Sequence, residues 1–117
     1  MVAPAIAQER AAEVGPLLLK DAVVSAAVAA VKTNEPWVLE EQVRLCEIPA
    51  PPFKEAARAK AYAQTFRDLG LTNVRIDKVG NVLGERPGAA PRPHVVFSAH
   101  LDTVFPEETD VRVTRLG

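Results

Sequence analysis

A histidine and an aspartate two residues apart, His100 and Asp102, are the residues whose types and spacing best suit chemistry. They follow an apolar run, residues 94–99, and the crevice at the carboxyl ends of strands is where open α/β sheets usually bind ligands. In extended backbone, residues two apart point to the same side. A neutral imidazole binds a metal through one nitrogen, and a carboxylate that accepts from the other N–H fixes its tautomer. We therefore expect His100 to be a metal ligand and Asp102 to orient it.

The pattern alone leaves a second interpretation of His100 open. His-x-Asp is a short pattern that also arises by chance, and a lone histidine at a strand end is more often a hydrogen-bonded surface residue than a ligand. Acidic residues follow the motif closely, and we interpret them as a solvated loop rather than as further ligands. They are Glu107, Glu108 and Asp110.

The sequence gives no support for a nucleophile or a phosphate site. Cys46 is the only cysteine, which excludes an internal disulfide and any CxxC-type zinc site. It lies on an apolar helical face, so we expect a small core residue rather than a nucleophile. Ser25 and Ser98 lack the Gly-x-Ser-x-Gly elbow that exposes a nucleophilic serine, and no glycine-rich phosphate loop is present. Any metal must be held by His, Asp and Glu.

Helices are expected in the first half of the chain. Residues 1–14 are rich in alanine and predict a weakly helical lead-in. Apolar residues at heptad-like spacing from Leu17 to Val31 predict an accessory helix that packs on the domain and ends near Asn34. Pro36 stands where a first helical turn tolerates proline, so we expect a second helix from about Glu35 to Glu47.

A third helix and a hairpin are expected next. An apolar stripe from Ala59 to Leu69 predicts the helix, and Gly70 stands where a left-handed residue commonly follows a helix end. Apolar and polar residues then alternate from Val74 to Asp77, which is the period-2 pattern of a half-buried strand. Gly80 and Asn81 provide a turn into a second strand that ends near Glu85.

The motif itself is expected to follow a buried strand. Residues 86–93 are rich in proline and glycine and predict an exposed loop. The nearly continuous apolar run from His94 to Ala99 predicts a central strand covered on both faces. Val111 and Val113 indicate one more strand. Helices, a hairpin and further strands together predict an α/β fold with a mixed sheet. The absence of a helix after the last strand predicts a truncated domain.

Composition and charge limit the classes of function. The chain has 117 residues, of which 48% are hydrophobic but only 5% aromatic, so we expect one soluble domain with a thin core. The 14 basic and 15 acidic residues are mixed along the chain, which argues against nucleic acid as a partner. The apolar run from Ala22 to Val31 is shorter than the roughly 20 residues of a membrane span.

The localisation stays open between two alternatives. Ala5-Ile6-Ala7 resembles the end of a secretory signal, but neither a basic nor an apolar region precedes it. The resemblance is either chance, with a cytoplasmic protein as the default, or the natural start lies upstream and the protein is exported.

Three ordered strings resemble the M20 family of zinc metallopeptidases, which includes peptidase T-like aminopeptidases, carboxypeptidases and aminoacylases. The string Phe97–Val104, FSAHLDTV, is similar to the family's first metal-binding motif. The string Leu45–Pro51, LCEIPAP, is similar to the segment after its first helix, and Asp77–Val82, DKVGNV, to its hairpin. The resemblance covers residues 36–117, whereas residues 1–35 have no counterpart.

The resemblance implies the N-terminal portion of a three-layer catalytic domain that hydrolyses a peptide or an N-acyl amino acid. It implies two zinc ions, with His100 as a ligand and Asp102 as the catalytic carboxylate that orients it. In the family, the other ligands, the general base and a lid or dimerisation domain follow downstream of this motif, and none of them can be located in this sequence. For the complete protein the resemblance also implies a homodimer. A piece with one ligand is expected to be inactive alone. The alternatives are a non-catalytic α/β binding domain and a partly folded structural remnant.

Overall fold

The chain divides into two units, residues 1–40 and residues 41–117. The structure is a computed structural model and describes residues 12–116. Most of the predicted lead-in, including Ala5-Ile6-Ala7, lies outside the described residues.

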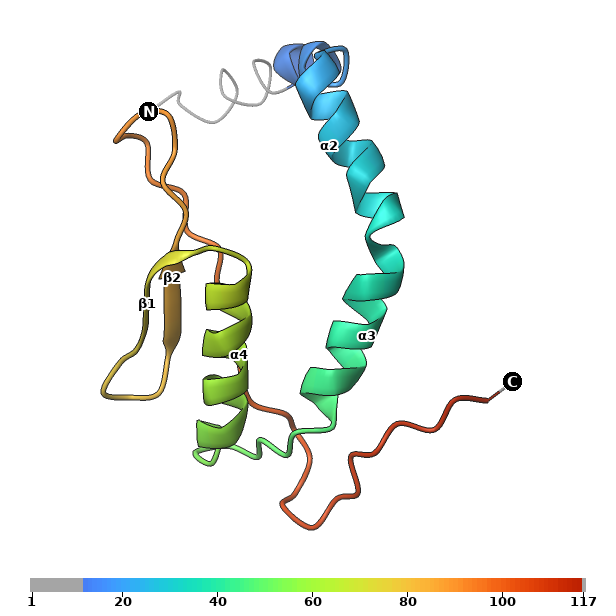
Figure 1. Ribbon diagram of the computed structural model, residues 1–117, viewed down its shortest axis with the longest axis vertical. Helices are drawn as coiled ribbons and strands as arrows, with labels where there is room; N and C mark the ends of the chain where they lie inside the picture. The colour runs from blue at the N-terminus through green and yellow to red at the C-terminus, as the bar shows by residue number, and fades with distance from the viewer. Residues whose placement is uncertain (1–11, 117) are drawn as a thin grey trace, which may run out of the picture. The chain divides into compact units, whose positions relative to one another are not determined.

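Helices form the described part of the first unit (Figure 1). A helical segment, Ala12–Leu18, meets α2, Ala22–Thr33, at a bend of 77°. Asp21 starts α2, because its Oδ1 accepts hydrogen bonds from the N–H groups of Val23, at 2.8 Å, and Val24, at 3.1 Å. A side-chain acceptor of this kind satisfies N–H groups that have no partner within the helix.

The predicted accessory helix therefore ends where expected but is broken near its start. It ends at Thr33 with Asn34 as its C-cap, but the Asp21 cap separates α2 from Leu17. No residue of α2 is buried. Among the described residues, no single helix is long and apolar enough to cross a membrane. Ala12–Leu18 and α2 would together be long and apolar enough, but they are bent by 77°.

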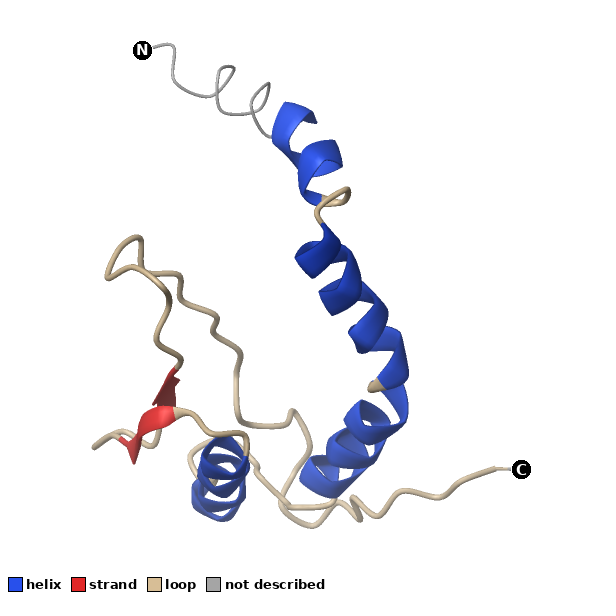
Figure 2. Ribbon diagram, turned by 45° about the horizontal axis from the view of Figure 1, so that its top comes forward, coloured by secondary structure: helices blue, strands red, loops and turns tan. Residues whose placement is uncertain are grey.

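The second unit places a helix against a hairpin. Helix α3, Glu35–Cys46, runs into this unit, and helix α4 spans Ala56–Asp68. Strands β1, Thr72–Ile76, and β2, Val82–Glu85, form an antiparallel sheet. The hairpin lies beside α4 in both views (Figures 1 and 2), and both strands contact the helix.

The end of α4 shows why the chain turns back into the hairpin. Gly70 has φ +75°, a left-handed conformation that glycine adopts without a Cβ penalty. Its N–H donates to the carbonyl of Arg67 at 2.9 Å, and that of Leu71 donates to the carbonyl of Phe66 at 3.0 Å. These two bonds define a Schellman motif, which confirms the helix end predicted from the sequence.

The hairpin has an irregular register. Thr72 pairs with Glu85, and Arg75 pairs with Leu83, so β1 has one more residue than β2 between these pairs. The extra residue forms a β-bulge, where Asn73 has φ +49°. The predicted alternation is accordingly incomplete, because Val74 is half-buried but Ile76 is 41% exposed.

The core is thin, as the composition predicts. Within the described residues, the buried apolar side chains all belong to alanines, and no large side chain is fully buried. The alanines are Ala50, Ala59 and Ala63. In β2, a Cβ built on Gly84 would lie 2.7 Å from Cδ2 of Phe66, so the small residue lets the helix and the hairpin approach closely.

The predicted central strand from His94 to Ala99 is wrong for this structure. Across residues 12–116 no strand follows β2, and the expected strand around Val111 and Val113 is likewise not formed. Val96 is 85% and Phe97 94% exposed. A strand needs a neighbour for its backbone N–H and C=O groups, and the hairpin does not extend to this segment. The fold of the described residues is thus mixed α/β with a two-stranded sheet.

Candidate metal centre

His100 and Asp102 meet as their spacing predicts. Nδ1 of His100 lies 3.1 Å from Oδ1 of Asp102. In the tautomer that donates from Nδ1 to the carboxylate, Nε2 keeps its lone pair. The imidazole is 76% exposed and the carboxylate 33% exposed. Most of the imidazole is therefore open to solvent, and in this tautomer Nε2 can act as a metal donor while Asp102 holds Nδ1.

The described residues fit one ligand position of a metal site and not a whole site. Catalytic zinc usually has three protein ligands and an open position for water. Within residues 12–116, no three His, Cys, Asp or Glu side chains are grouped so that they could hold a metal ion. His100 with Asp102 therefore has the chemistry of a ligand and its orienting carboxylate, and further ligands would have to come from elsewhere.

The loop after α3 forms hydrogen bonds with Thr103, the residue that follows Asp102. The N–H of Thr103 donates to the carbonyl of Ala50 at 2.8 Å, and its hydroxyl donates to the same oxygen at 3.3 Å. Ala50 is fully buried. The string LCEIPAP and the motif string thus lie together, although about fifty residues separate them in sequence.

Arg58, in the first turn of α4, holds the motif from the other side. Its Nη1 donates to the carbonyl of Leu101, between the two site residues, at 3.1 Å. Its Nε donates to the carbonyl of Ile48 at 3.1 Å, and its Nη2 donates to the same oxygen and to the carbonyl of Cys46. One guanidinium therefore joins α3, the loop after it and the motif.

The acidic loop after the motif has its own cationic partners. Glu107 forms an ion pair with Lys54. Arg112 donates hydrogen bonds to Asp110 and lowers the pKa of that carboxyl to about 2. These residues and Glu108 are exposed, which agrees with the solvated loop predicted from the sequence.

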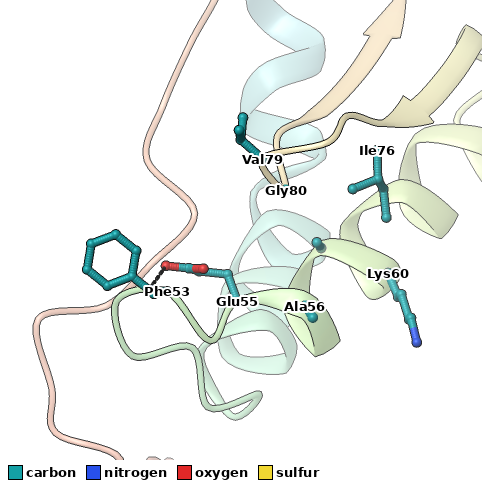
Figure 3. Close-up of a pocket in the computed structure, with 8 residues that line it drawn as sticks. Phe53, Glu55, Ala56, Lys60, Ile76, Val79 and Gly80 are labelled. Atoms are coloured by element: carbon teal, nitrogen blue, oxygen red, sulfur yellow. Dashed lines mark hydrogen bonds between the residues drawn. The ribbon is translucent and has the colours of Figure 1, made fainter.

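A shallow recess of about 270 Å³ lies between the start of α4 and the hairpin turn (Figure 3). Ile76, at the end of β1, and Val79, in the hairpin turn, line it together with Lys60 of α4. Phe53, with φ +68°, is 98% exposed, and its N–H donates to Oε1 of Glu55 at 2.6 Å. Neither His100 nor Asp102 lines this recess.

Sequence reasoning missed Arg58 and the contact between Ala50 and Thr103. The sequence contains one weak signal for Arg58: the helix dipole disfavours a cation in the first turn of a helix, and a further contact would offset this cost. Cys46 is predicted as a small core residue, and in the structure it is half-buried. Its backbone carbonyl accepts a hydrogen bond from Arg58.

Comparison with known proteins gave no assignment: no family model matches the chain, and no curated protein matches it.

Proposed function

We propose that this chain supplies one zinc ligand, His100, and its orienting carboxylate, Asp102, to a two-zinc hydrolase of the M20 type. The substrate class would be a peptide or an N-acyl amino acid, cleaved at an amide bond. The observation that supports the proposal is the 3.1 Å contact between Nδ1 of His100 and Oδ1 of Asp102, within a string that resembles the family's metal-binding motif. Under this proposal, residues 36–117 belong to a larger three-layer catalytic domain.

Each residue has a defined task in this proposal. Zinc in such a site supplies a Lewis acid that polarises the scissile carbonyl and activates water. His100 binds through Nε2 while Asp102 holds Nδ1–H, which fixes the tautomer and makes the ring a better donor. The general base and the remaining ligands would come from the rest of the complete enzyme, because the described residues offer no further cluster.

The test compares three variants of the complete hydrolase by metal analysis and by kinetics on one substrate. His100→Ala removes a ligand and should strongly lower the zinc content. Asp102→Asn keeps the shape and an acceptor oxygen but loses the charge, so turnover should fall by about 10 to 100-fold while much of the zinc is retained. His94→Ala is the matched control, since it removes the chain's other histidine.

Two results would refute these roles. Full zinc content in His100→Ala would show that this histidine is not a ligand. Unchanged turnover in Asp102→Asn would show that the charge of this carboxylate does not contribute to catalysis. Failure of the complete protein to bind zinc or to hydrolyse any amide would instead favour a non-catalytic binding domain.

A further inference from the structure

Arg58 is the one charged side chain that is buried among the described residues, with 7% of its surface exposed. Its position is unfavourable in two respects. It lies in the first turn of α4, where the helix dipole opposes a positive charge, and burial removes the guanidinium from water. Its hydrogen bonds within residues 12–116 go to backbone carbonyls, which belong to three different segments.

The carbonyl groups compensate for the charge of Arg58. Cys46 is the last residue of α3, so its carbonyl lies at the negative end of that helix, where cations are stabilised. The carbonyls of Ile48 and Leu101 supply the other acceptors. A planar guanidinium has five donors in a fixed geometry and can serve acceptors in several directions at once, which an ammonium group on a flexible stem cannot do equally well.

From these contacts we infer that Arg58 is a positioning residue of the candidate metal centre, an inference that rests on the proposed function. The carbonyl of Leu101 belongs to the peptide unit that joins Leu101 to Asp102, and Nη1 of Arg58 fixes its direction. That direction decides whether the side chains of His100 and Asp102 point to the same side. The guanidinium acts on the pair through the backbone and does not touch the ring.

Arg58 also supports the second attachment of the motif. The same guanidinium holds the carbonyl of Ile48, two residues before Ala50, whose own carbonyl accepts from Thr103. The loop from Ile48 to Ala50 and the motif are therefore held by one network. Loss of the guanidinium should loosen both attachments together, while the helix end at Gly70 and the hairpin should remain.

The test uses Arg58→Met, which keeps most of the stem without the donors, and Arg58→Lys, which keeps the charge. Arg67→Met, at an exposed position of the same helix, is the matched control. In this chain, Arg58→Met should speed hydrogen exchange of the Thr103 amide by about tenfold or more, because hydrogen bonds to a charged group are lost. The amides of β2 should be unaffected, Arg58→Lys should be intermediate, and Arg67→Met should behave as the unsubstituted chain.

In the complete hydrolase, Arg58→Met should bind zinc roughly tenfold more weakly and have a lower kcat with little change in KM, Arg58→Lys should be intermediate, and Arg67→Met should be unchanged. A merely structural role predicts a lower Tm with unchanged Thr103 exchange relative to β2 and unchanged zinc affinity, and that result would overturn the inference. If Arg58→Met does not fold, Arg58→Lys tests the inference instead. Thr103 exchange and zinc affinity equal to those of the unsubstituted protein in Arg58→Lys would also overturn it. Failure of the proposed function shows separately, as zinc retention in His100→Ala.

Discussion

Asp77 uses both carboxylate oxygens to fix the turn of the hairpin. Oδ1 accepts from the N–H groups of Val79, at 3.0 Å, and Asn81, at 2.9 Å, and Oδ2 accepts from Nδ2 of Asn81 at 2.9 Å. The side-chain hydrogen bond from Asn81 is the main reason that the pKa of Asp77 is lowered. A carboxylate with these donors is stabilised in its charged form.

We predict that Asn81→Ala raises the pKa of Asp77 towards its ordinary value of about 3.9, as measured by an NMR titration of the carboxyl carbon. Asn73→Gly is the matched control, because the amide of Asn73 instead lowers the pKa of Glu85. That variant should raise the pKa of Glu85 and leave that of Asp77 unchanged. An unaltered pKa of Asp77 in Asn81→Ala would contradict the account.

The same pKa shift predicts a pH dependence of stability. Because the pKa is lower in the folded than in the unfolded chain, the contribution of Asp77 is fully present above about pH 4 and is lost as the pH falls through the folded pKa. Urea midpoints should therefore fall less between pH 5 and pH 2 in Asp77→Asn than in the unsubstituted chain. Parallel profiles would show that Asp77 contributes nothing to the loss.

At the residue scale, the sequence predicted local contacts and missed distant ones. The contact between His100 and Asp102 follows from the alternation of side chains over two residues. The contacts of Arg58 with Leu101 and of Thr103 with Ala50 join residues more than forty positions apart. No periodicity within a segment encodes such pairs, so only the fold shows that Arg58 supports the site.

At the scale of elements, the end of α4 depends on the backbone of Gly70. A Cβ at this position would meet no atom within 4 Å, but φ is +75°. Gly70→Ala should therefore lower the free energy of unfolding by about 1–2 kcal/mol through backbone strain alone. The measurement is urea denaturation. Unchanged stability would mean that the helix end is not formed as described.

Substitution of Gly84 should also lower the stability, but through steric overlap rather than backbone strain. Its added Cβ would lie 2.7 Å from Phe66 and 2.8 Å from Leu71, so Gly84→Ala forces the packed side chains to move. We expect the free energy of unfolding to fall by about 1–3 kcal/mol, which is typical of overpacking. Gly88→Ala is the control, because its nearest neighbour, a backbone oxygen, would lie at 3.6 Å. Equal unfolding curves for the two variants would argue against the close packing of β2 on α4.

Elements formed by neighbouring residues were predictable, and elements that need distant partners were not. The α4 stripe with Gly70 and the hairpin depend on local patterns, and the structure contains both. The break before α2 was missed because Asp21 lies within an otherwise periodic pattern. The segment from His94 to Ala99 has the composition of a buried strand, but pairing decides whether a strand forms. Between residues 12 and 116, no strand pairs with it.

At the scale of the whole molecule, the donor set predicts that this chain alone does not hydrolyse amides, with or without added zinc. Three protein ligands and a general base near the attacking water are needed. The described residues offer one histidine with its carboxylate. The measurement is turnover of a peptide and of an N-acyl amino acid with added zinc. Zinc-dependent turnover that disappears in His100→Ala would contradict this prediction.

The exposed apolar segment predicts that the chain self-associates. Val95, Val96 and Phe97 are 70%, 85% and 94% exposed. Extended backbone with unpaired N–H and C=O groups and apolar side chains is a template for pairing with another chain. The thin alanine core offers little apolar surface to compete for this segment within the monomer. The weight-average sedimentation coefficient should therefore rise with protein concentration.

Phe97→Lys should weaken this association by roughly ten- to a hundredfold, because burial of a phenylalanine side chain contributes about 1.5–3 kcal/mol and a lysine on a strand edge opposes pairing. Val79→Lys is the matched control, since it introduces the same charge at a residue that is 83% exposed in the hairpin turn. If the contacts between copies are made by residues 95–97, only the first variant shifts the association to higher concentration. A monodisperse monomer whose thermal transition is sharp and independent of concentration would show instead that the segment is covered within the chain itself.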